Sequence, residues 1–146
     1  MSLVQNKKVG LSYEIIKKYE AGIVLSGSEV KSIRNKHGEL GGAHVLIRGG
    51  EAFIVGLEIP PYQPKNITTA YEPARTRKLI LTKSEIYEIE RKASEKGLTI
   101  IPISLYNKGK LIKLEIAIGR GKNKFDKRQT IKKRDTERDI GRTLKN

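Results

Sequence analysis

The sequence contains no cysteine and no tryptophan, and it has no long hydrophobic run. Without cysteine, neither a disulfide framework nor a thiolate zinc site can form, which is typical of proteins of the cytosol. No segment approaches the roughly 20 consecutive apolar residues of a membrane-spanning helix, and the first ten residues lack the apolar core of a signal peptide. We therefore expect a cytoplasmic protein that does not enter a membrane.

The residue types of common catalytic centres are also few. The two histidines, His37 and His44, have no third metal ligand placed beside them, so we expect no bound metal. The serines fall mainly in helix-cap positions, and no G-x-S-x-G motif occurs. The aspartates near the C-terminus lie among lysines and arginines, in a segment that cannot supply a rigid catalytic pocket. We expect neither catalytic residues nor a cofactor, and a nuclease or RNA-modifying enzyme is the least supported class.

Positive charge is what the sequence has in excess. Its 146 residues include 30 Lys and Arg against 16 Asp and Glu, a net charge of +14. Such a balance points to a polyanionic partner, and nucleic acid is the first candidate. An anionic membrane surface is the competing partner, but the basic C-terminal segment lacks the apolar face of an interfacial helix.

Half of that charge lies in residues 119–146, where eleven Lys and Arg face four Asp and Glu. The apolar residues of this tail form no stripe that could bury against a core, and a short isolated helix is marginal in water. We expect a tail that is disordered or helical, and that becomes helical when an anionic partner holds it. A solvated charge run that only maintains solubility is the alternative. Gly119-Arg120-Gly121 predicts a hinge directly after a strand.

Residues 1–118 read as one domain of short strands with two inserted helices. The sequences Ser26-Gly27-Ser28-Glu29 and Thr82-Lys83-Ser84-Glu85 are capping boxes that open the helices. Gly49-Gly50 and Asn107-Lys108-Gly109 predict the turns of two hairpins. The first twelve residues show little pattern, and residues 57–74 form a proline-rich surface loop. The strands are expected at residues 13–19, 22–25, 43–48, 52–56, 77–81, 98–106 and 111–118.

This pattern predicts a mainly β fold with inserted helices. An OB-like small antiparallel β-barrel over residues 1–118, followed by the basic tail at 119–146, fits the number of strands and the hairpins best. Such a barrel is a common platform for nucleic acid. An open α+β sheet would give nearly the same pattern.

Three cations gather where the proline-rich loop becomes a strand. Arg75, Arg77 and Lys78 are predicted to lie along the barrel rim and to hold a phosphate backbone. A solvated strand edge that charge protects against aggregation is the alternative. Tyr62 and Tyr71, in the same loop, can stack on bases or pack on the scaffold.

Seven ordered segments resemble one known family along essentially the entire chain. These proteins are the SsrA-binding proteins, also called small protein B. The matching segments are YEAGI at 19–23, GSEVKSIR at 27–34, GEAF at 50–53, P-x-RTRKL at 73–79, the strand at 97–106, GK leading to DKR at 121–128, and IKKRD at 131–135.

The resemblance implies a bacterial, cytoplasmic, non-enzymatic adaptor with an OB-like barrel. Such proteins bind the tRNA-like domain of transfer-messenger RNA and carry it to stalled ribosomes in trans-translation. The expected partners are therefore transfer-messenger RNA and the ribosome, with the protein itself a monomer. In the family the tail forms a helix in the empty messenger channel beside the decoding centre. A general RNA-binding or ribosomal protein with a basic extension is the alternative, which composition alone supports equally well.

The resemblance also suggests roles for particular residues. Taken alone, Glu20 reads as a turn residue, but by matching position it becomes an RNA contact, and Ile80 falls where family members commonly have leucine. Together with the rim cations, the expected RNA-binding residues are Asn6, Lys7, Glu20, Arg75, Arg77, Lys78 and Ile80. The expected ribosome-binding residues are Lys122, Lys124, Asp126, Lys127, Arg128, Ile131, Lys132, Arg134 and Arg138. Leu11 and Ser12 depart from the family pattern, which usually has a histidine and an acid at these positions.

Overall fold

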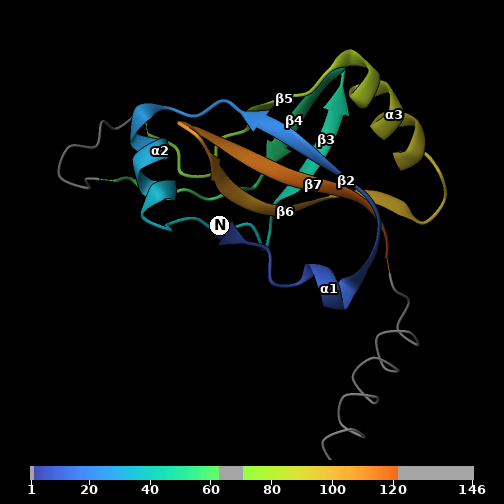
Figure 1. The fold of residues 1–146 in the computed structure, drawn as a ribbon, viewed down its shortest axis with the longest axis horizontal. Coiled ribbons are helices and arrows are strands. Elements are labelled where there is room, and N and C mark those ends of the chain that lie inside the picture. Colours follow the sequence, from blue (N-terminus) through green and yellow to red (C-terminus); the bar gives the residue numbers. More distant parts are fainter. Residues whose placement is uncertain (1, 63–70, 122–146) are drawn as a thin grey trace, which may run out of the picture.

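One antiparallel sheet organises the molecule (Figure 1). The structure is a computed structural model that describes residues 2–62 and 71–121. In the described part the sheet has seven strands, in the order β1-β6-β7-β2-β5-β4-β3. The strands are β1 (Ser2–Gln5), β2 (Tyr13–Ile23), β3 (His44–Arg48), β4 (Glu51–Val55), β5 (Arg77–Ile80), β6 (Leu98–Lys108) and β7 (Leu111–Gly121).

The sheet curves around a single hydrophobic core without closing into a barrel. Its edge strands are β1 and β3, yet β3 also lies against β6, so the sheet folds back over itself. The predicted mainly β fold with inserted helices is confirmed, and the curvature is consistent with an OB-like fold. The open edges are the difference from a fully closed barrel.

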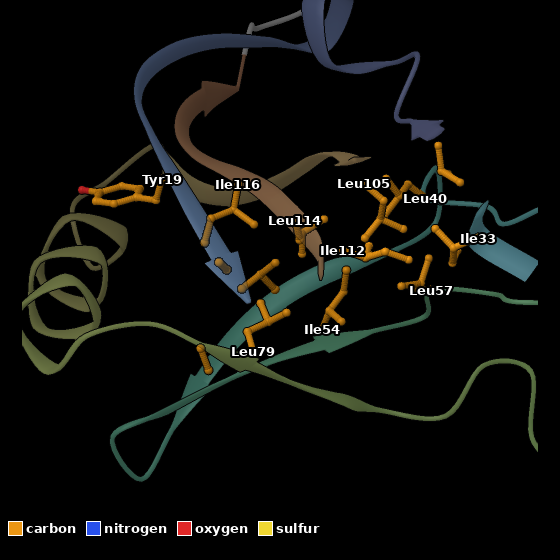
Figure 2. Close-up of a cluster of buried hydrophobic side chains, with 14 of the residues drawn as sticks. Tyr19, Ile33, Leu40, Ile54, Leu57, Leu79, Leu105, Ile112, Leu114 and Ile116 are labelled. Atoms are coloured by element: carbon orange, nitrogen blue, oxygen red, sulfur yellow. The ribbon is translucent and has the colours of Figure 1, made fainter. Parts of the chain in front are cut away.

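Alternation along β7 supplies much of the core (Figure 2). Ile112, Leu114, Ile116 and Ile118 are all buried, while Lys113 and Glu115 between them are partly exposed. Successive side chains of a strand point to opposite faces, so this pattern directs one face inward. Each fully buried Leu or Ile contributes about 1.5–3 kcal/mol relative to an exposed one.

The two longer helices begin where the sequence predicts. Helix α2 (Gly27–Arg34) starts after Ser26, whose hydroxyl accepts from the Glu29 N–H at 3.2 Å while the Ser26 N–H donates to the Glu29 carboxylate at 2.8 Å. Helix α3 (Lys83–Ala93) has the same box at Thr82 and Glu85. Their core contacts come from Ile33 and Ile89, both fully buried. In the described residues, no helix is long and apolar enough to cross a membrane.

The N-terminal segment is more ordered than its pattern indicates. Residues 2–12 contain β1, which pairs with β6, and the one-turn helix α1 (Val9–Ser12). Strand β6 has a register shift between Pro102 and Ser104, at a residue that has no N–H to donate to a neighbouring strand.

The Gly-Arg-Gly sequence is a strand end and not the expected hinge. Gly119 pairs with Ile15 and Thr99, and Gly121 pairs with Tyr13. Strand β7 therefore continues three residues beyond the expected boundary at 118. Residues 122–146, which hold most of the predicted tail, lie outside the described part of the chain.

Candidate nucleic-acid interface

Three of the expected RNA-binding residues lie on one exposed face of β2 and β5. Gly22 of β2 is the register partner of Ile80 in β5. Glu20 precedes Gly22 by two residues, and Lys78 precedes Ile80 by two, so all of these positions face the same side of the sheet. We refer to Glu20, Lys78 and Ile80 as the outer face.

Glu20 lies inside β2, opposite Glu115 of β7, and not in a turn as its sequence context alone indicates. Its carboxylate accepts hydrogen bonds from the Tyr106 hydroxyl at 2.5 Å and from the Lys108 ammonium at 2.8 Å. These two bonds hold the pKa of Glu20 below its ordinary value. Burial and the bond to Glu20 raise the pKa of Tyr106. The site therefore presents an ionised, oriented carboxylate whose remaining lone pairs can accept from base amino groups.

Sequence reasoning did not find Tyr106 and Lys108 as partners of Glu20. Both lie at the end of β6, and they reach Glu20 across the intervening strand β7. Only the strand order brings these residues together. Their alternating positions in a predicted hairpin show that they share a face, but not which strand lies beyond β7.

Ile80 forms the apolar part of the outer face. Its side chain is 60% exposed, and it covers the backbone of Gly22 so closely that a Cβ built at Gly22 would lie 3.1 Å from the Ile80 Cβ. Val24, directly after β2, and Leu111 of β7 are also exposed aliphatic residues. Apolar side chains beside exposed lysines suit the sugars and base faces of RNA together with its phosphates.

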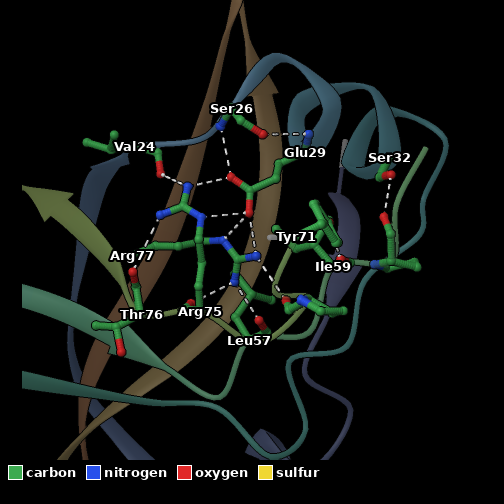
Figure 3. A network of polar contacts seen from close by, with 12 residues as sticks. Val24, Ser26, Glu29, Ser32, Leu57, Ile59, Tyr71, Arg75, Thr76 and Arg77 are labelled. Carbon is green, nitrogen blue, oxygen red and sulfur yellow. Dashed lines mark hydrogen bonds and ion pairs between the residues drawn. The ribbon is translucent and has the colours of Figure 1, made fainter. Parts of the chain in front are cut away.

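The three predicted rim cations occupy different environments, which corrects the expectation of one exposed row. Figure 3 shows two of them, Arg75 and Arg77, with their polar partners. Arg77 is fully buried, Arg75 is 37% exposed and Lys78 is 51% exposed. Strand alternation explains this, because Arg77 and Leu79 point into the core while Lys78 and Ile80 point out. Arg77 is therefore not positioned to touch RNA directly in this structure.

Glu29 neutralises the buried arginine. Arg77 donates to Glu29 Oε2 from Nε at 2.7 Å and from Nη2 at 2.5 Å, and Arg75 Nη2 donates to Oε1 at 2.5 Å. Burial of Glu29 opposes its ionisation, but the bonds from Arg75, the Ser26 N–H and Arg77 outweigh this and hold its pKa below the ordinary value. The sequence pattern identified Glu29 only as a helix cap, and its role as an arginine partner is additional.

The same region anchors both ends of the proline-rich loop. Arg77 Nη1 donates to the Leu57 carbonyl at 2.6 Å, the Ile59 N–H donates to the Pro73 carbonyl at 2.9 Å, and the Tyr71 hydroxyl donates to the Ile59 carbonyl at 2.5 Å. Tyr71 thus packs on the scaffold, as the alternative reading proposed. Tyr62 is 41% exposed and lies beside Lys31, with 5.7 Å between the ammonium and the ring centroid.

Asn6 joins the N-terminal segment to the bulge of β6. Its side-chain amide donates to the Pro102 carbonyl at 3.0 Å, and its backbone N–H donates to the Ile103 carbonyl at 2.8 Å. The Asn6 Oδ1 atom accepts from the Lys8 N–H at 3.2 Å. The polar atoms of Asn6 are therefore used in hydrogen bonds within the fold, whereas the neighbouring Lys7 is exposed.

The remaining predictions concern metals and the ribosome. Across residues 2–62 and 71–121, no group of three or more His, Cys, Asp or Glu side chains is placed to hold a metal ion. All nine residues that the family resemblance assigns to ribosome binding, from Lys122 to Arg138, lie outside the described residues.

Comparison with known proteins identifies the family. The family model described as SmpB protein matches residues 3–146. The chain belongs to the SmpB family. Similar curated proteins of this family are called SsrA-binding protein, which confirms the resemblance seen in the sequence. The one from Mycoplasma mycoides subsp. mycoides SC is 52% identical over 93% of this chain and 92% of its own length. The one from Nitrosomonas europaea is 46% identical over 99% of this chain and 96% of its own length.

A solved structure agrees with the SmpB assignment. It comes from work described as a journey of tmRNA-SmpB to the centre of the bacterial ribosome. One of its chains is 34% identical to the present one and superimposes with a TM-score of 0.69, covering 87% of this chain and 92% of that chain. The shared fold thus extends over most of both SmpB proteins.

Proposed function

We propose that this SmpB family member is a cytoplasmic, non-enzymatic adaptor that binds the tRNA-like domain of transfer-messenger RNA and delivers it to stalled ribosomes. The observation that carries this proposal is the family match over residues 3–146, together with SsrA-binding relatives that align with nearly the whole chain. The similar solved chain, from a tmRNA-SmpB study of the bacterial ribosome, supports the same two partners.

The outer face is the proposed RNA-binding surface of the sheet. Glu20 supplies an oriented acceptor, Lys78 an exposed cation and Ile80 an apolar contact. Phosphate contacts give affinity without sequence information, whereas contacts to base edges distinguish one RNA from another. A carboxylate on a cationic protein opposes phosphate binding, so its presence on this surface favours a base-reading role for Glu20.

Lys7 and Arg75 are proposed as additional phosphate contacts. Both have exposed or half-exposed cationic groups. Arg77 and Asn6 are assigned to a different task, because their polar atoms hold the loop and the N-terminal segment in place. They support the RNA-binding surface through the positions of their neighbours.

The basic tail is proposed to act on the ribosome. Residues 119–146 carry half of the net charge of +14, and the tail residues named above would contact ribosomal RNA around the decoding centre and the messenger channel. A segment of one charge sign that has little apolar surface can follow a channel walled by phosphates.

Binding of the full chain to transfer-messenger RNA and to an elongator tRNA, at two salt concentrations, tests the proposal. A truncated chain ending at Gly121 and Glu20→Ala are measured alongside. We expect a preference for transfer-messenger RNA that survives truncation and declines in Glu20→Ala, while tagging of stalled products is lost in the truncated chain. Equal and steeply salt-dependent binding to both RNAs, lost on truncation, would instead identify a general charge-driven binder.

A further inference from the structure

A second cationic feature lies at the edge of the sheet, away from the outer face. The end of β1 and the following turn face the segment after α2, and together they line a groove of about 410 Å³. Figure 1 shows the N-terminal strand beside α2. Lys7 and Lys8 lie on one wall of this groove and Lys36 on the other, and among the described residues Glu39 is the one carboxylate that lines it.

The three lysines leave the groove positively charged. All of them are exposed, and none forms an ion pair with any residue in the described ranges. Glu39 accepts a hydrogen bond from the Gly41 N–H at 2.9 Å, so part of its hydrogen-bond acceptor capacity is already used within its own turn. Three ammonium groups and one carboxylate give the groove a local excess of positive charge, which suits an anion.

Lys36 adopts a left-handed backbone conformation, which is unusual for a lysine. Its φ of 64° is the only positive value at a non-glycine residue in the described chain. The Lys36 N–H donates to the Ile33 carbonyl at 2.8 Å and the His37 N–H to the Ser32 carbonyl at 2.9 Å. These two bonds form a Schellman motif, and its left-handed position normally holds glycine because a side chain is strained there.

Helix electrostatics do not explain the lysine at this position. A cation near a helix C-terminus gains a modest interaction with the macrodipole, but Lys31 and Arg34 already provide this in the last turn of α2. The carbonyls of Ser32 and Ile33 also already accept hydrogen bonds from the backbone that follows the helix. A residue that has a strained backbone conformation and lines a cationic groove is better explained by a ligand.

We propose that the groove formed by Lys7, Lys8 and Lys36 binds a phosphodiester of the RNA whose bases meet the outer face. This inference rests on the proposed function, because it takes the occupant to be the same RNA. Lys36 is the anchoring residue on the α2 side of the groove. An RNA strand could reach both sites, because Gln5, Ser104, Glu115 and Glu20 form one row across β1, β6, β7 and β2. Three strand spacings separate the ends of such a row by about 14 Å.

Lys36→Gly separates binding from folding. Glycine relieves the left-handed backbone, so the melting temperature of this variant is expected to stay unchanged or to rise. Its affinity for the tRNA-like domain of transfer-messenger RNA is expected to fall about 3- to 10-fold near 150 mM salt, with a salt slope that is smaller by about 1. Lys36→Arg keeps the charge and should bind close to wild type.

Lys96→Gln is the matched control, because Lys96 is also exposed in the turn after a helix but lies outside the groove. A triple variant with Lys7→Gln, Lys8→Gln and Lys36→Gly should lose more affinity than Lys36→Gly alone. If wild type binds the tRNA-like domain specifically but Lys36→Gly behaves as Lys96→Gln does, the groove inference is overturned, and an acidic protein segment becomes the better occupant. If wild type itself shows no preference for this RNA, the proposed function fails first.

Discussion

The Tyr106 hydroxyl donates a 2.5 Å hydrogen bond to the Glu20 carboxylate although 86 positions separate the two residues in the chain. The bond crosses β7 and joins the ends of β6 and β2 on the outer face. It fixes the direction of an acceptor that would otherwise rotate freely on an exposed strand. Preorganisation of this kind lowers the entropy lost on binding.

Tyr106→Phe tests the orientation of Glu20. We expect RNA affinity to fall roughly 2- to 10-fold, because one neutral-to-charged hydrogen bond is lost while Lys108 still holds the carboxylate. Tyr87→Phe is the control, since Tyr87 is 69% exposed and its hydroxyl makes no hydrogen bond to the described residues. Titration calorimetry with the tRNA-like domain measures the difference. Equal affinities for the two variants would show that Tyr106 does not orient Glu20.

Arg75 and Arg77 should respond differently to substitution. Arg77→Ala removes the buried partner of Glu29 and is expected to destabilise the fold by about 3–5 kcal/mol. Arg75→Ala should cost about 1 kcal/mol or less, because its side chain is 37% exposed and Arg77 remains on Glu29. Urea unfolding of both variants checks the order. A larger loss from Arg75→Ala would mean that the exposed arginine, and not the buried one, anchors the loop.

The interaction of α3 with β2 should weaken in acid. Glu88 accepts from Lys17 and from the Tyr19 hydroxyl at 2.7 Å, and with Lys92 also nearby its pKa is lowered from 4.5 to about 2. Because the folded-state pKa lies below the unfolded one, the stabilisation is complete above about pH 4.5 and is lost as the pH falls towards 2. The melting temperature of Glu88→Gln should therefore depend less on pH in this window than that of wild type. Glu95→Gln, at an exposed carboxylate without an ion pair in the described residues, should retain the wild-type slope.

The position at which the tail is removed should matter for the fold. A chain ending at Gly121 keeps all of β7, whereas one ending at Ile118 loses the pairing of Gly119 with Ile15 and Thr99. Thermal melts should show a lower melting temperature for the shorter chain. Full stability of that chain would indicate that the last three residues of β7 contribute nothing to the sheet.

Gly119→Ala provides an independent measure of the same strand end. A Cβ at Gly119 would meet Ile101 Cδ1 at 2.4 Å, whereas one at Gly121 would meet nothing within 4 Å. We expect Gly119→Ala to destabilise the fold by about 1–3 kcal/mol, as overpacking does, and Gly121→Ala to have little effect. Denaturant unfolding compares the two. Similar unfolding free energies would show that Ile101 can move aside without cost.

Local signals in the sequence predicted local structure well. The capping boxes at Ser26 and Thr82 mark the starts of α2 and α3, because each depends on residues only three positions apart. Hairpins at Gly49-Gly50 and around Gly109 are predictable for the same reason. Strand β1 was missed because four residues at the edge of a sheet carry too little periodicity to stand out.

The candidate site depends on contacts between distant segments, and these were harder to predict. Arg77 looks like an exposed cation until Glu29, 48 positions earlier, is placed beside it. Glu20 reads as a turn residue until β7 is seen to pair with it on one side. The family resemblance predicted Glu20 and Ile80 as RNA contacts without this geometry, but it could not separate the buried Arg77 from the exposed Lys78.

The hydrogen bond from Ile59 to Pro73 closes the proline-rich loop at its base. Tyr71 and Arg77 also hold the two ends of this loop. A change in the length of the loop should therefore cost mainly a closure entropy, which grows slowly with length. Relatives of different length are therefore expected to place their insertions and deletions here. The anchored base of the loop is thus a position where the chain can lengthen without changing the proposed RNA-binding surface.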